Sequence, residues 1–374
     1  MKILISLVSD QTIPNVRFIK EYKENVSDFL FVSTQKMENK GCCDWIVKTT
    51  GISNTSVIIV DEYNPQTIIS GLNEINFEQY DNIIVNLTGG TKIMSLTIYE
   101  YFREEGADIF YVTGQNDDYI KLFPGKNKNR IKFQTKLSLH EYLMAHGFEI
   151  KQTESCGIDY DVLDKWYKKY LNGVFNDHVD ALNVLRSKRG KKFDYTSSDS
   201  VCSFLKAINF TPPNGMLSKN EVKALTGEWL EEYVGASLMN DLRLSSENLS
   251  IGSIITKNGI PNEMDVMFYY NSKFYVIECK TSIINKVKFW KQQVLPDGTV
   301  KFDELLKNEN ILGETVYKSD YLKNRFGLFA KPYILTLSKK EEVSEHQLKR
   351  AELSGIKLID QDMLLSAKSI KELL

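Results

Sequence analysis

A single β-hairpin is predicted for residues Asn262–Thr281, NEMDVMFYYNSKFYVIECKT, and it constrains the fold more than any other stretch of the chain. Two strand-like runs flank Asn271-Ser272, which supplies a two-residue turn. This turn sets Asp265 directly across from Glu278, with Cβ atoms about 5 Å apart. Because strand side chains alternate, Lys280 lies on the same face as Glu278.

Two carboxylates at this separation repel each other unless a cation lies between them, and a divalent metal with hard oxygen ligands meets that need. The adjacent lysine then holds a reacting phosphate. An exposed strand with a Glu/Lys pair is the structural alternative, since the same spacing occurs at Glu21/Lys23. The run Phe274–Ile277 argues against it, because it is apolar on both faces and marks a buried strand. Charged residues at the end of such a strand are costly unless they are paired or bound to metal.

The segment Asn220–Met239, just upstream, is predicted to form one amphipathic helix. Its expected buried residues include Trp229, Tyr233 and Leu238. Three glutamates crowd its middle, namely Glu228, Glu231 and Glu232. The helix therefore places further carboxylates close in sequence to the hairpin.

A helix followed by a hairpin with Asp and Glu-x-Lys is the order of the PD-(D/E)xK nuclease core, which residues 219–281 resemble. In that family a glutamate of the helix, in a Gly-x-x-x-Glu setting, completes the metal site. The pattern falls on Gly227 and Glu231, and Glu232 is the alternative. The chain departs from the family pattern in that Pro261 precedes Asp265 by four residues instead of directly.

The resemblance implies that Glu231, Asp265 and Glu278 bind one Mg²⁺ or Mn²⁺ ion, with the backbone carbonyl of Cys279 as a further ligand. It also implies that Lys280 orients the attacking water or stabilises the developing charge. The expected activity is hydrolysis of phosphodiester bonds.

The remaining C-terminal residues continue an α/β pattern. Strands are predicted at Phe329–Thr336 and Ile356–Asp360, and helices at Val343–Ser354 and Gln361–Leu373. Just after the hairpin, cations and amides surround one tryptophan: Lys286, Lys288, Trp290, Lys291, Gln292 and Gln293. This group is either a contact surface for single-stranded nucleic acid or a solvated helix face with one core tryptophan.

The N-terminal half alternates buried strands with helices, which predicts a doubly wound parallel sheet. The expected strands are Lys2–Val8, Asp28–Val32, Ser56–Val60, Asn82–Asn86 and Ala107–Val112. The expected helices are Asn15–Lys23, Gln66–Ile75 and Lys92–Glu105. Ligands of such sheets bind beyond the carboxyl ends of the strands.

Two loops occupy that edge, Ser9-Asp10-Gln11-Thr12 and Asn86-Leu87-Thr88-Gly89-Gly90-Thr91-Lys92. In the second loop the glycines allow close approach to the backbone, and free N–H groups at the start of the next helix favour anions. The spacing is not that of a phosphate-binding P-loop, which needs glycine where this chain has Asn86 and Thr91. A tight strand-to-helix connector without a ligand is the structural alternative.

Both loops look like the ligand motifs of CARF domains, the Rossmann-like sensors of cyclic oligoadenylates in type III CRISPR defence. A CARF half followed by a PD-(D/E)xK half resembles the CRISPR ancillary nucleases that cyclic tetra-adenylate activates. That family implies a homodimer with one cyclic ligand bound across its two-fold axis. Lys92 would neutralise phosphate, and the full set of implied ligand residues is Ser9, Asp10, Gln11, Thr12, Asn86, Thr88, Gly89, Gly90, Thr91 and Lys92.

The length of 374 residues fits two domains. We expect a CARF sensor at 1–138, a helical connector or nuclease extension at 139–217, and the nuclease domain at 218–374. Helices are predicted within the middle segment at Leu139–Ala145, Tyr160–Leu171 and His178–Leu185.

The net charge of −2 provides no global attraction for nucleic acid, so any positive surface must be local. Arg186–Lys192 is either such a surface or a solvated loop, and Lys126–Arg130 is expected to be a hairpin turn. The five cysteines show no metal-binding spacing, which fits a reducing cytoplasm. No stretch has the length of a membrane span or of the apolar core of a signal peptide.

The resulting prediction is a metal-dependent endonuclease that cuts single-stranded RNA and DNA when cyclic tetra-adenylate binds, with the nicking of duplex DNA left open as a further activity. Two alternatives remain. In the first, the chain is a regulator that binds the cyclic messenger but has an inactive nuclease half. In the second, it is a ring nuclease whose N-terminal half degrades the messenger.

Overall fold

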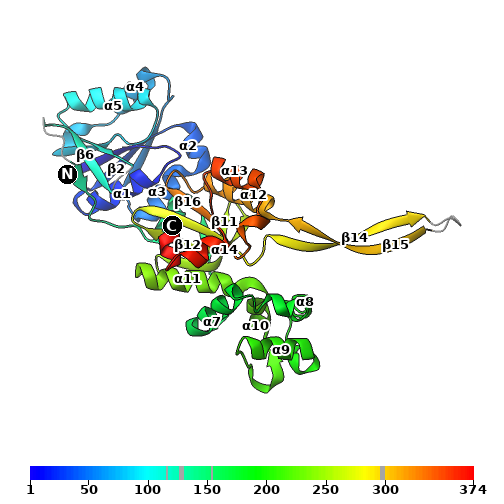
Figure 1. The fold of residues 1–374 in the computed structure, drawn as a ribbon. Helices are drawn as coiled ribbons and strands as arrows, with labels where there is room; N and C mark the ends of the chain where they lie inside the picture. Colours follow the sequence, from blue (N-terminus) through cyan, green and yellow to red (C-terminus); the bar gives the residue numbers. More distant parts are fainter. Residues whose placement is uncertain (115–116, 126–129, 153–154, 295–299) are drawn as a thin grey trace.

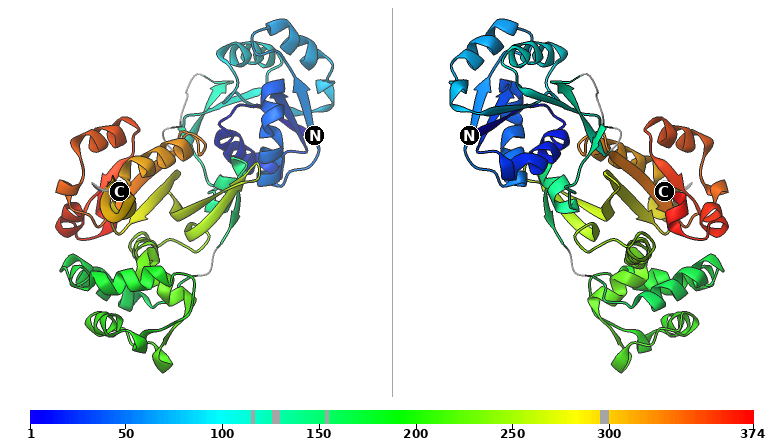
Figure 2. Two further views of the ribbon diagram at one scale, coloured as in Figure 1. Left: turned by 90° about the vertical axis from the view of Figure 1, so that its right-hand side faces the viewer. Right: turned by 90° about the vertical axis from the view of Figure 1, so that its left-hand side faces the viewer.

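The structure, a computed structural model, describes residues 1–374 apart from 115–116, 126–129, 153–154 and 295–299, and describes 284–309 without their side chains. An N-terminal and a C-terminal α/β part lie next to each other, and a group of helices lies on the far side of the second part (Figures 1 and 2). Of the basic turn expected at Lys126–Arg130, residues 126–129 lie outside the described residues.

The N-terminal sheet has seven strands in the described part of the chain, in the order β3-β2-β1-β4-β5-β6-β7. The first five run parallel, as predicted, and β6 and β7 continue the sheet as an antiparallel pair. Their bounds are β1 Lys2–Leu7, β2 Asp28–Ser33, β3 Thr55–Ile59, β4 Asn82–Asn86, β5 Asp108–Val112, β6 Asp118–Phe123 and β7 Arg130–Lys132.

Helices cover both faces of this sheet, which confirms the doubly wound fold. Helices α1 (Ile13–Tyr22) and α3 (Cys42–Thr50) pack with Leu4 and Phe31 of the strands in one core cluster. Helices α4 (Pro65–Asn73) and α5 (Lys92–Glu104) pack against the opposite face in another. The three predicted helices are confirmed within two residues, whereas α2 (Gln35–Lys40) and α3 were not predicted.

The middle segment is helical, as predicted, and it contacts both halves. Helix α6 (Leu139–Ala145) belongs to the N-terminal core cluster, while β8 (Glu149–Lys151) pairs with the C-terminal sheet. Helices α7 (Tyr160–Leu171), α8 (Val179–Ser187) and α9 (Asp199–Ala207) form one cluster with the C-terminal part, and a small ladder joins β9 (Phe193–Asp194) to β10 (Met216–Leu217).

The C-terminal sheet has the order β17-β16-β13-β12-β11-β8. Strands β11 (Leu249–Lys257), β12 (Ile260–Tyr270) and β13 (Lys273–Lys280) form an antiparallel meander. Strands β16 (Ala330–Thr336) and β17 (Lys357–Ile359) then add in parallel to β13. The predicted hairpin is confirmed: Tyr270 pairs with Lys273, and Asn271 and Ser272 both take the positive φ angles of a tight two-residue turn.

Helices flank this sheet as well. Helix α11 (Trp229–Leu242) follows α10 (Lys219–Lys223), and helices α12 (Leu312–Lys323), α13 (Glu345–Leu353) and α14 (Gln361–Ser366) complete the part. The final helix predicted for Gln361–Leu373 is wrong in one respect, because it ends at Ser366 and a 3₁₀ turn follows at Ile370–Leu373.

Strands β14 (Ile284–Val294) and β15 (Val300–Asn310) pair in a long hairpin that extends away from the body (Figure 1). The helix alternative for Lys286–Gln293 is therefore wrong. The side chains of these residues lie outside the part of the structure that is described, so their role as nucleic-acid contacts stays a prediction.

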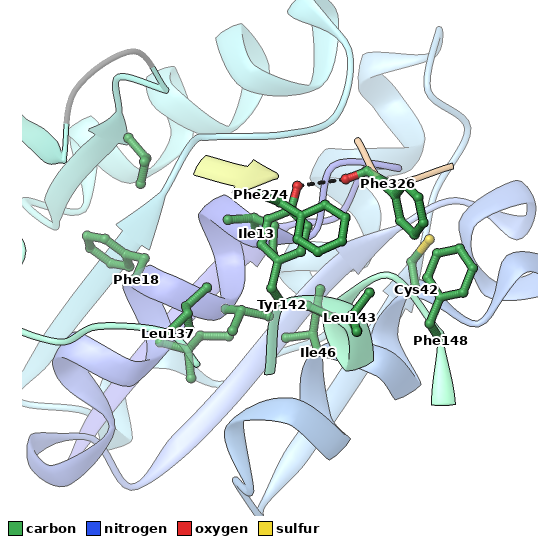
Figure 3. Packing of buried hydrophobic residues seen from close by; sticks show 14 of the residues in the cluster. Ile13, Phe18, Cys42, Ile46, Leu137, Tyr142, Leu143, Phe148, Phe274 and Phe326 are labelled. Atoms are coloured by element: carbon green, nitrogen blue, oxygen red, sulfur yellow. Dashed lines mark hydrogen bonds between the residues drawn. The ribbon is translucent and has the colours of Figure 1, made fainter. Parts of the chain in front are cut away.

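The two halves share one hydrophobic core around Tyr142 (Figure 3). The Tyr142 ring stacks on Phe274 of the hairpin at 4.8 Å between centroids, and its hydroxyl donates to the Phe326 carbonyl at 2.7 Å. Phe148 and Phe326 also pack together at 5.0 Å. The hairpin turn is tied to the N-terminal part too, since the Ser272 hydroxyl donates to Asp117 at 2.7 Å.

All five cysteines are free. Across the residues described, no helix combines the length and apolar character that crossing a bilayer requires.

Candidate functional site

The hairpin brings Asp265, Glu278 and Lys280 together, as the sequence predicts. The ladder between β12 and β13 runs from the turn to the pair Val266–Ile277. Asp265 and Glu278 are the next residues on the two strands. The Lys280 ammonium lies 2.8 Å from Glu278 and 3.8 Å from Asp265. Asp265 also accepts a hydrogen bond from the backbone N–H of Cys279 at 2.6 Å, which fixes this carboxylate at the end of β13.

A second lysine, Lys318 of α12, completes this cluster and was not predicted. Its ammonium lies 3.0 and 3.1 Å from the two carboxylate oxygens of Glu278. Glu278 is only 6% exposed, so both of its oxygens are neutralised by lysines inside the protein. The sequence offered no signal for Lys318, because it arrives from a helix 40 residues downstream.

The predicted helix Asn220–Met239 is interrupted by a π-helical turn at Ala224–Glu228, so the expectation of one continuous helix is wrong. The interruption centres on Gly227, whose φ of 147° is one that side-chain-bearing residues rarely adopt. Such insertions occur frequently at functional sites. Trp229, beyond the turn, is buried as predicted.

The glutamates after this turn differ in their surroundings. Glu232 accepts a hydrogen bond from the Cys156 backbone N–H at 2.9 Å and so holds the preceding segment in place. Glu231 is half-buried, and the negative charge of Asp265 adds to the upward shift of its pKa. Of the two alternatives for the third carboxylate, Glu231 is therefore the one that faces the hairpin cluster electrostatically.

The carboxylates split into two electrostatic groups. Burial raises the pKa of Asp265, and repulsion from Glu278 raises it further. Burial also raises the pKa of Glu231, with repulsion from Asp265 next in importance. Burial by itself raises the pKa of Glu278. The positive charges of Lys280 and Lys318 outweigh this effect and hold that pKa below its ordinary value. Lys280 lies 3.8 Å from Asp265 and opposes these upward shifts, but the net pKa shift stays upward for Glu231 and Asp265 and is downward only for Glu278.

This donor set fits a divalent cation. Buried carboxylate oxygens that repel each other are the hard ligands that Mg²⁺ and Mn²⁺ prefer. Within the described ranges, however, no three His, Cys, Asp or Glu side chains are grouped closely enough to hold an ion. In this arrangement Lys280 and Lys318 neutralise Glu278.

Glu231 lines a polar pocket of about 240 Å³ together with Glu228, Glu263 and Lys223. At this pocket Arg189 pairs with Glu228 at 2.9 Å. Arg189 belongs to the basic run Arg186–Lys192, which starts at the end of α8 and thus places one of its cations beside the pocket. Whether this run contacts nucleic acid stays a prediction.

The two predicted ligand loops lie side by side at the carboxyl ends of β1 and β4, which pair directly. Gly89 has a φ of 123°, and a Cβ there would lie 2.5 Å from the Leu7 carbonyl oxygen of the other loop's strand. The Ser9 side chain lies 3.4 Å from the same position. Only glycine therefore permits this close approach of the two loops.

Several of the predicted ligand residues bond within the protein. The Asn86 amide is buried and donates to Asn15 at 2.8 Å, and the Thr12 hydroxyl donates to the Ala145 carbonyl. The Thr88 hydroxyl accepts from the Val112 N–H at 2.6 Å, and the Thr91 hydroxyl donates to the Glu62 carbonyl at 2.8 Å. In this arrangement these side chains shape the loops.

The remaining residues of the two loops face outward. Gly90 and Lys92 are exposed, and Ser9 and Gly89 are half-buried beside them. Asp10 is exposed and its carboxylate pairs with Lys40 at 2.7 Å. Lys92 and the loop backbone are thus the groups most open to an anion.

The first loop also contacts the C-terminal part directly. The Gln11 side-chain oxygen accepts a hydrogen bond from the Leu328 backbone N–H at 3.1 Å. Leu328 follows α12, which carries Lys318, and precedes β16, which pairs with β13. A loop at the ligand edge and a helix at the carboxylate cluster are therefore joined through one short segment.

Comparisons with known proteins agree with this arrangement. A family model described as the Card1 CARF domain matches residues 3–142, and one described as the Card1-like endonuclease domain matches residues 218–294. A search of curated proteins finds no match.

Two solved structures share the fold over nearly their full length. The structure of Can2 from Sulfobacillus thermosulfidooxidans in complex with cyclic tetra-adenylate has a TM-score of 0.72 and 23% identity, covering 98% of this chain and 97% of that one. The structure of protein VC1899 from Vibrio cholerae has a TM-score of 0.70 and 18% identity, covering 98% and 95%.

Proposed function

We propose, on the premise that this chain belongs to the CARF nucleases with a Card1-like endonuclease domain, that it is a metal-dependent endonuclease switched on by cyclic tetra-adenylate in type III CRISPR defence. Its substrates in this proposal are single-stranded RNA and DNA. The observation that carries the proposal is the cluster of the buried carboxylates Asp265 and Glu278 with Lys280 at the end of the predicted hairpin. We retain the division into a sensor at 1–138, a connector at 139–217 and a nuclease domain at 218–374.

In the nuclease domain, Glu231, Asp265, Glu278 and the Cys279 carbonyl would hold one Mg²⁺ or Mn²⁺ ion. When bound, such an ion polarises the scissile phosphate and lowers the pKa of a coordinated water. Lys280 positions that water or stabilises charge on the phosphate, since its ammonium already lies between Glu278 and Asp265. The backbone N–H of Cys279 keeps Asp265 oriented.

In the sensor domain, Lys92 and the Gly89-Gly90 backbone bind the phosphates of the cyclic ligand. Exposed N–H groups at the start of α5 add a favourable dipole for anions. Ser9, Asp10 and Gln11 border the same edge, while Thr12, Asn86, Thr88 and Thr91 keep the loops in shape.

The sensor works as a homodimer in this proposal. Leu96 on α5 is 69% exposed and Ile93 is 38% exposed, just beyond the ligand loop. A second copy of the chain would cover these apolar side chains and present the same loop to the other half of a symmetric ring. The neighbouring structure of Can2 holds cyclic tetra-adenylate, which supports this choice of ligand.

Coupling between ligand and nuclease would run through the contacts that join the halves. Ligand binding that moves the first loop changes the Gln11–Leu328 hydrogen bond and the Thr12–Ala145 hydrogen bond. Both lead to the shared core around Tyr142 and Phe326. A ligand that binds one arrangement of these contacts better than another shifts the population of nuclease geometries.

The test is cleavage of single-stranded RNA, single-stranded DNA and supercoiled plasmid with Mn²⁺ or Mg²⁺, each with and without cyclic tetra-adenylate. Cutting that needs both metal and ligand is the expected result. Cutting without ligand removes the sensor from the proposal. Ligand binding without cutting favours the regulator, and disappearance of the ligand favours the messenger-degrading enzyme.

A further inference from the structure

Helix α12 presents two exposed tyrosines beside the carboxylate cluster. Tyr317 is 60% exposed and Tyr321 is 50% exposed. They stand four residues apart, so they lie on one face of the helix, about 6 Å from each other along its axis. Lys318 lies between them in sequence and reaches Glu278 at 3.0 Å. Single exposed side chains are common on a protein surface, but two exposed rings on one helix face form a patch, and an exposed patch marks an interaction site.

Each ring carries a cation on one side. The Arg350 guanidinium lies 4.5 Å from the centroid of the Tyr317 ring, and the Arg325 guanidinium lies 4.3 Å from that of Tyr321. Both rings stay at least half exposed in the presence of these arginines. The exposed face of α12 therefore combines two aromatic rings with two positive charges. Arg350 comes from α13, and Arg325 from the residues just after α12.

The opposite face of α12 is fixed to the nuclease sheet, so the tyrosines have a defined position relative to the site. Leu312, Val316 and Leu322 are buried. Ser319 and Leu322 line a small cavity that Glu278 also lines. The helix thus packs against β16, the neighbour of the strand that carries Glu278, and its tyrosines are exposed.

We propose that Tyr317 and Tyr321, with Arg350 and Arg325, form a stacking platform that binds bases of a single-stranded nucleic acid and leads the strand to Glu278. This deepens the proposed function and rests on it. Bases stack on exposed aromatic rings without regard to sequence, and nearby arginines attract the phosphates. The spacing of the rings, about 6 Å along the helix axis, is close to the rise of two stacked nucleotides at about 3.4 Å each.

A duplex would not use this platform, because its bases are already stacked and paired. Single-stranded RNA and DNA share the base faces and phosphates that the platform contacts. The proposal therefore assigns the discrimination between single and double strands to α12, and leaves the choice between RNA and DNA to other groups.

The experiment measures binding of short fluorescein-labelled poly(A) RNA and poly(dA) DNA by fluorescence anisotropy, with full-length protein carrying Lys280→Ala to prevent cleavage. Adding Tyr317→Ala or Tyr321→Ala should weaken single-strand binding by about 5- to 100-fold each. Tyr317→Phe and Tyr321→Phe should bind like the parent, since the ring is kept. Tyr111→Ala is the matched control, because Tyr111 is an exposed tyrosine of the N-terminal sheet.

A labelled duplex and an oligonucleotide of abasic sites serve as further probes, and neither should distinguish the alanine variants from the parent. Parent-like affinity of both alanine variants for single strands would overturn the platform while leaving the nuclease proposal intact. Equal weakening for the abasic probe would also overturn it, since stacking would not be involved. If the parent itself bound no single strand, the proposed substrate class would fall together with the platform.

Discussion

In the proposed metal site Lys318 would compete with the ion for Glu278, and we therefore expect Lys318→Met to tighten metal binding. The substitution keeps most of the apolar stem and removes the ammonium that lies 3.0 and 3.1 Å from the two Glu278 oxygens. Lys318 is 38% exposed, so solvent screens the pair and its contribution is about 1 kcal/mol. Without this ion pair, metal binding no longer has to break it, so the dissociation constant for the metal should be roughly fivefold lower.

The assay is titration of the full-length protein with Mn²⁺, followed by calorimetry or by the electron paramagnetic resonance signal of the free ion. Lys323→Met is the matched control, because Lys323 lies on the same helix and its ammonium bonds to the Ser354 carbonyl at 2.7 Å instead of to Glu278. Affinity equal to the wild type in the Lys318 variant would refute the competition. Weaker binding would show that Lys318 supports the site instead.

Further predictions test the remaining parts of the proposal. Lys280→Ala should lower cleavage by about 10²- to 10³-fold while Mn²⁺ still binds, and wild-type cleavage would contradict the hairpin assignment. Lys92→Ala should weaken cyclic tetra-adenylate binding by roughly 10- to 100-fold, measured by calorimetry, with metal binding unchanged. At saturating cyclic tetra-adenylate, Gln11→Ala should still reduce ligand-stimulated cleavage, because it removes the hydrogen bond to Leu328; full stimulation at saturation would exclude this contact from the coupling. In metal-free buffer the melting temperature should fall as pH rises above about 4.5, because the folded state retains protons on Glu231 and Asp265 that the unfolded chain releases. Saturating Mn²⁺ or Glu231→Gln should flatten that slope, and a melting temperature that rises with pH would contradict the pKa directions.

The sequence predicts correctly those parts of the fold that depend on interactions between residues close together in the chain. The hairpin register followed from a two-residue turn, and this alone placed Asp265 beside Glu278 and Lys280. The strand–helix alternation likewise predicted the N-terminal sheet, because parallel strands buried on both faces are apolar throughout.

Prediction failed where tertiary contacts override a local pattern. The segment Asn220–Met239 has helical periodicity throughout, yet Gly227 takes a positive φ and opens a π-turn that periodicity cannot show. Asn86 and Thr12 have the polar character of ligand residues, but their partners, Asn15 and Ala145, come together only in the fold.

The position of α12 connects the main features of the molecule. Its start follows the β14–β15 hairpin, its middle places Lys318 on Glu278, and its end leads to Leu328, which bonds to Gln11 of the ligand edge. Phe326, which lies between α12 and Leu328, is anchored to Tyr142, and we propose that a shift of the ligand loop reaches α12 through this packed segment. Loss of the Lys318–Glu278 contact would then free a carboxylate for metal and, at the same time, move the tyrosines that receive the strand. Metal affinity and single-strand affinity should therefore respond together to the cyclic ligand, whereas a sensor acting only on dimerisation would leave the metal affinity of each site unchanged.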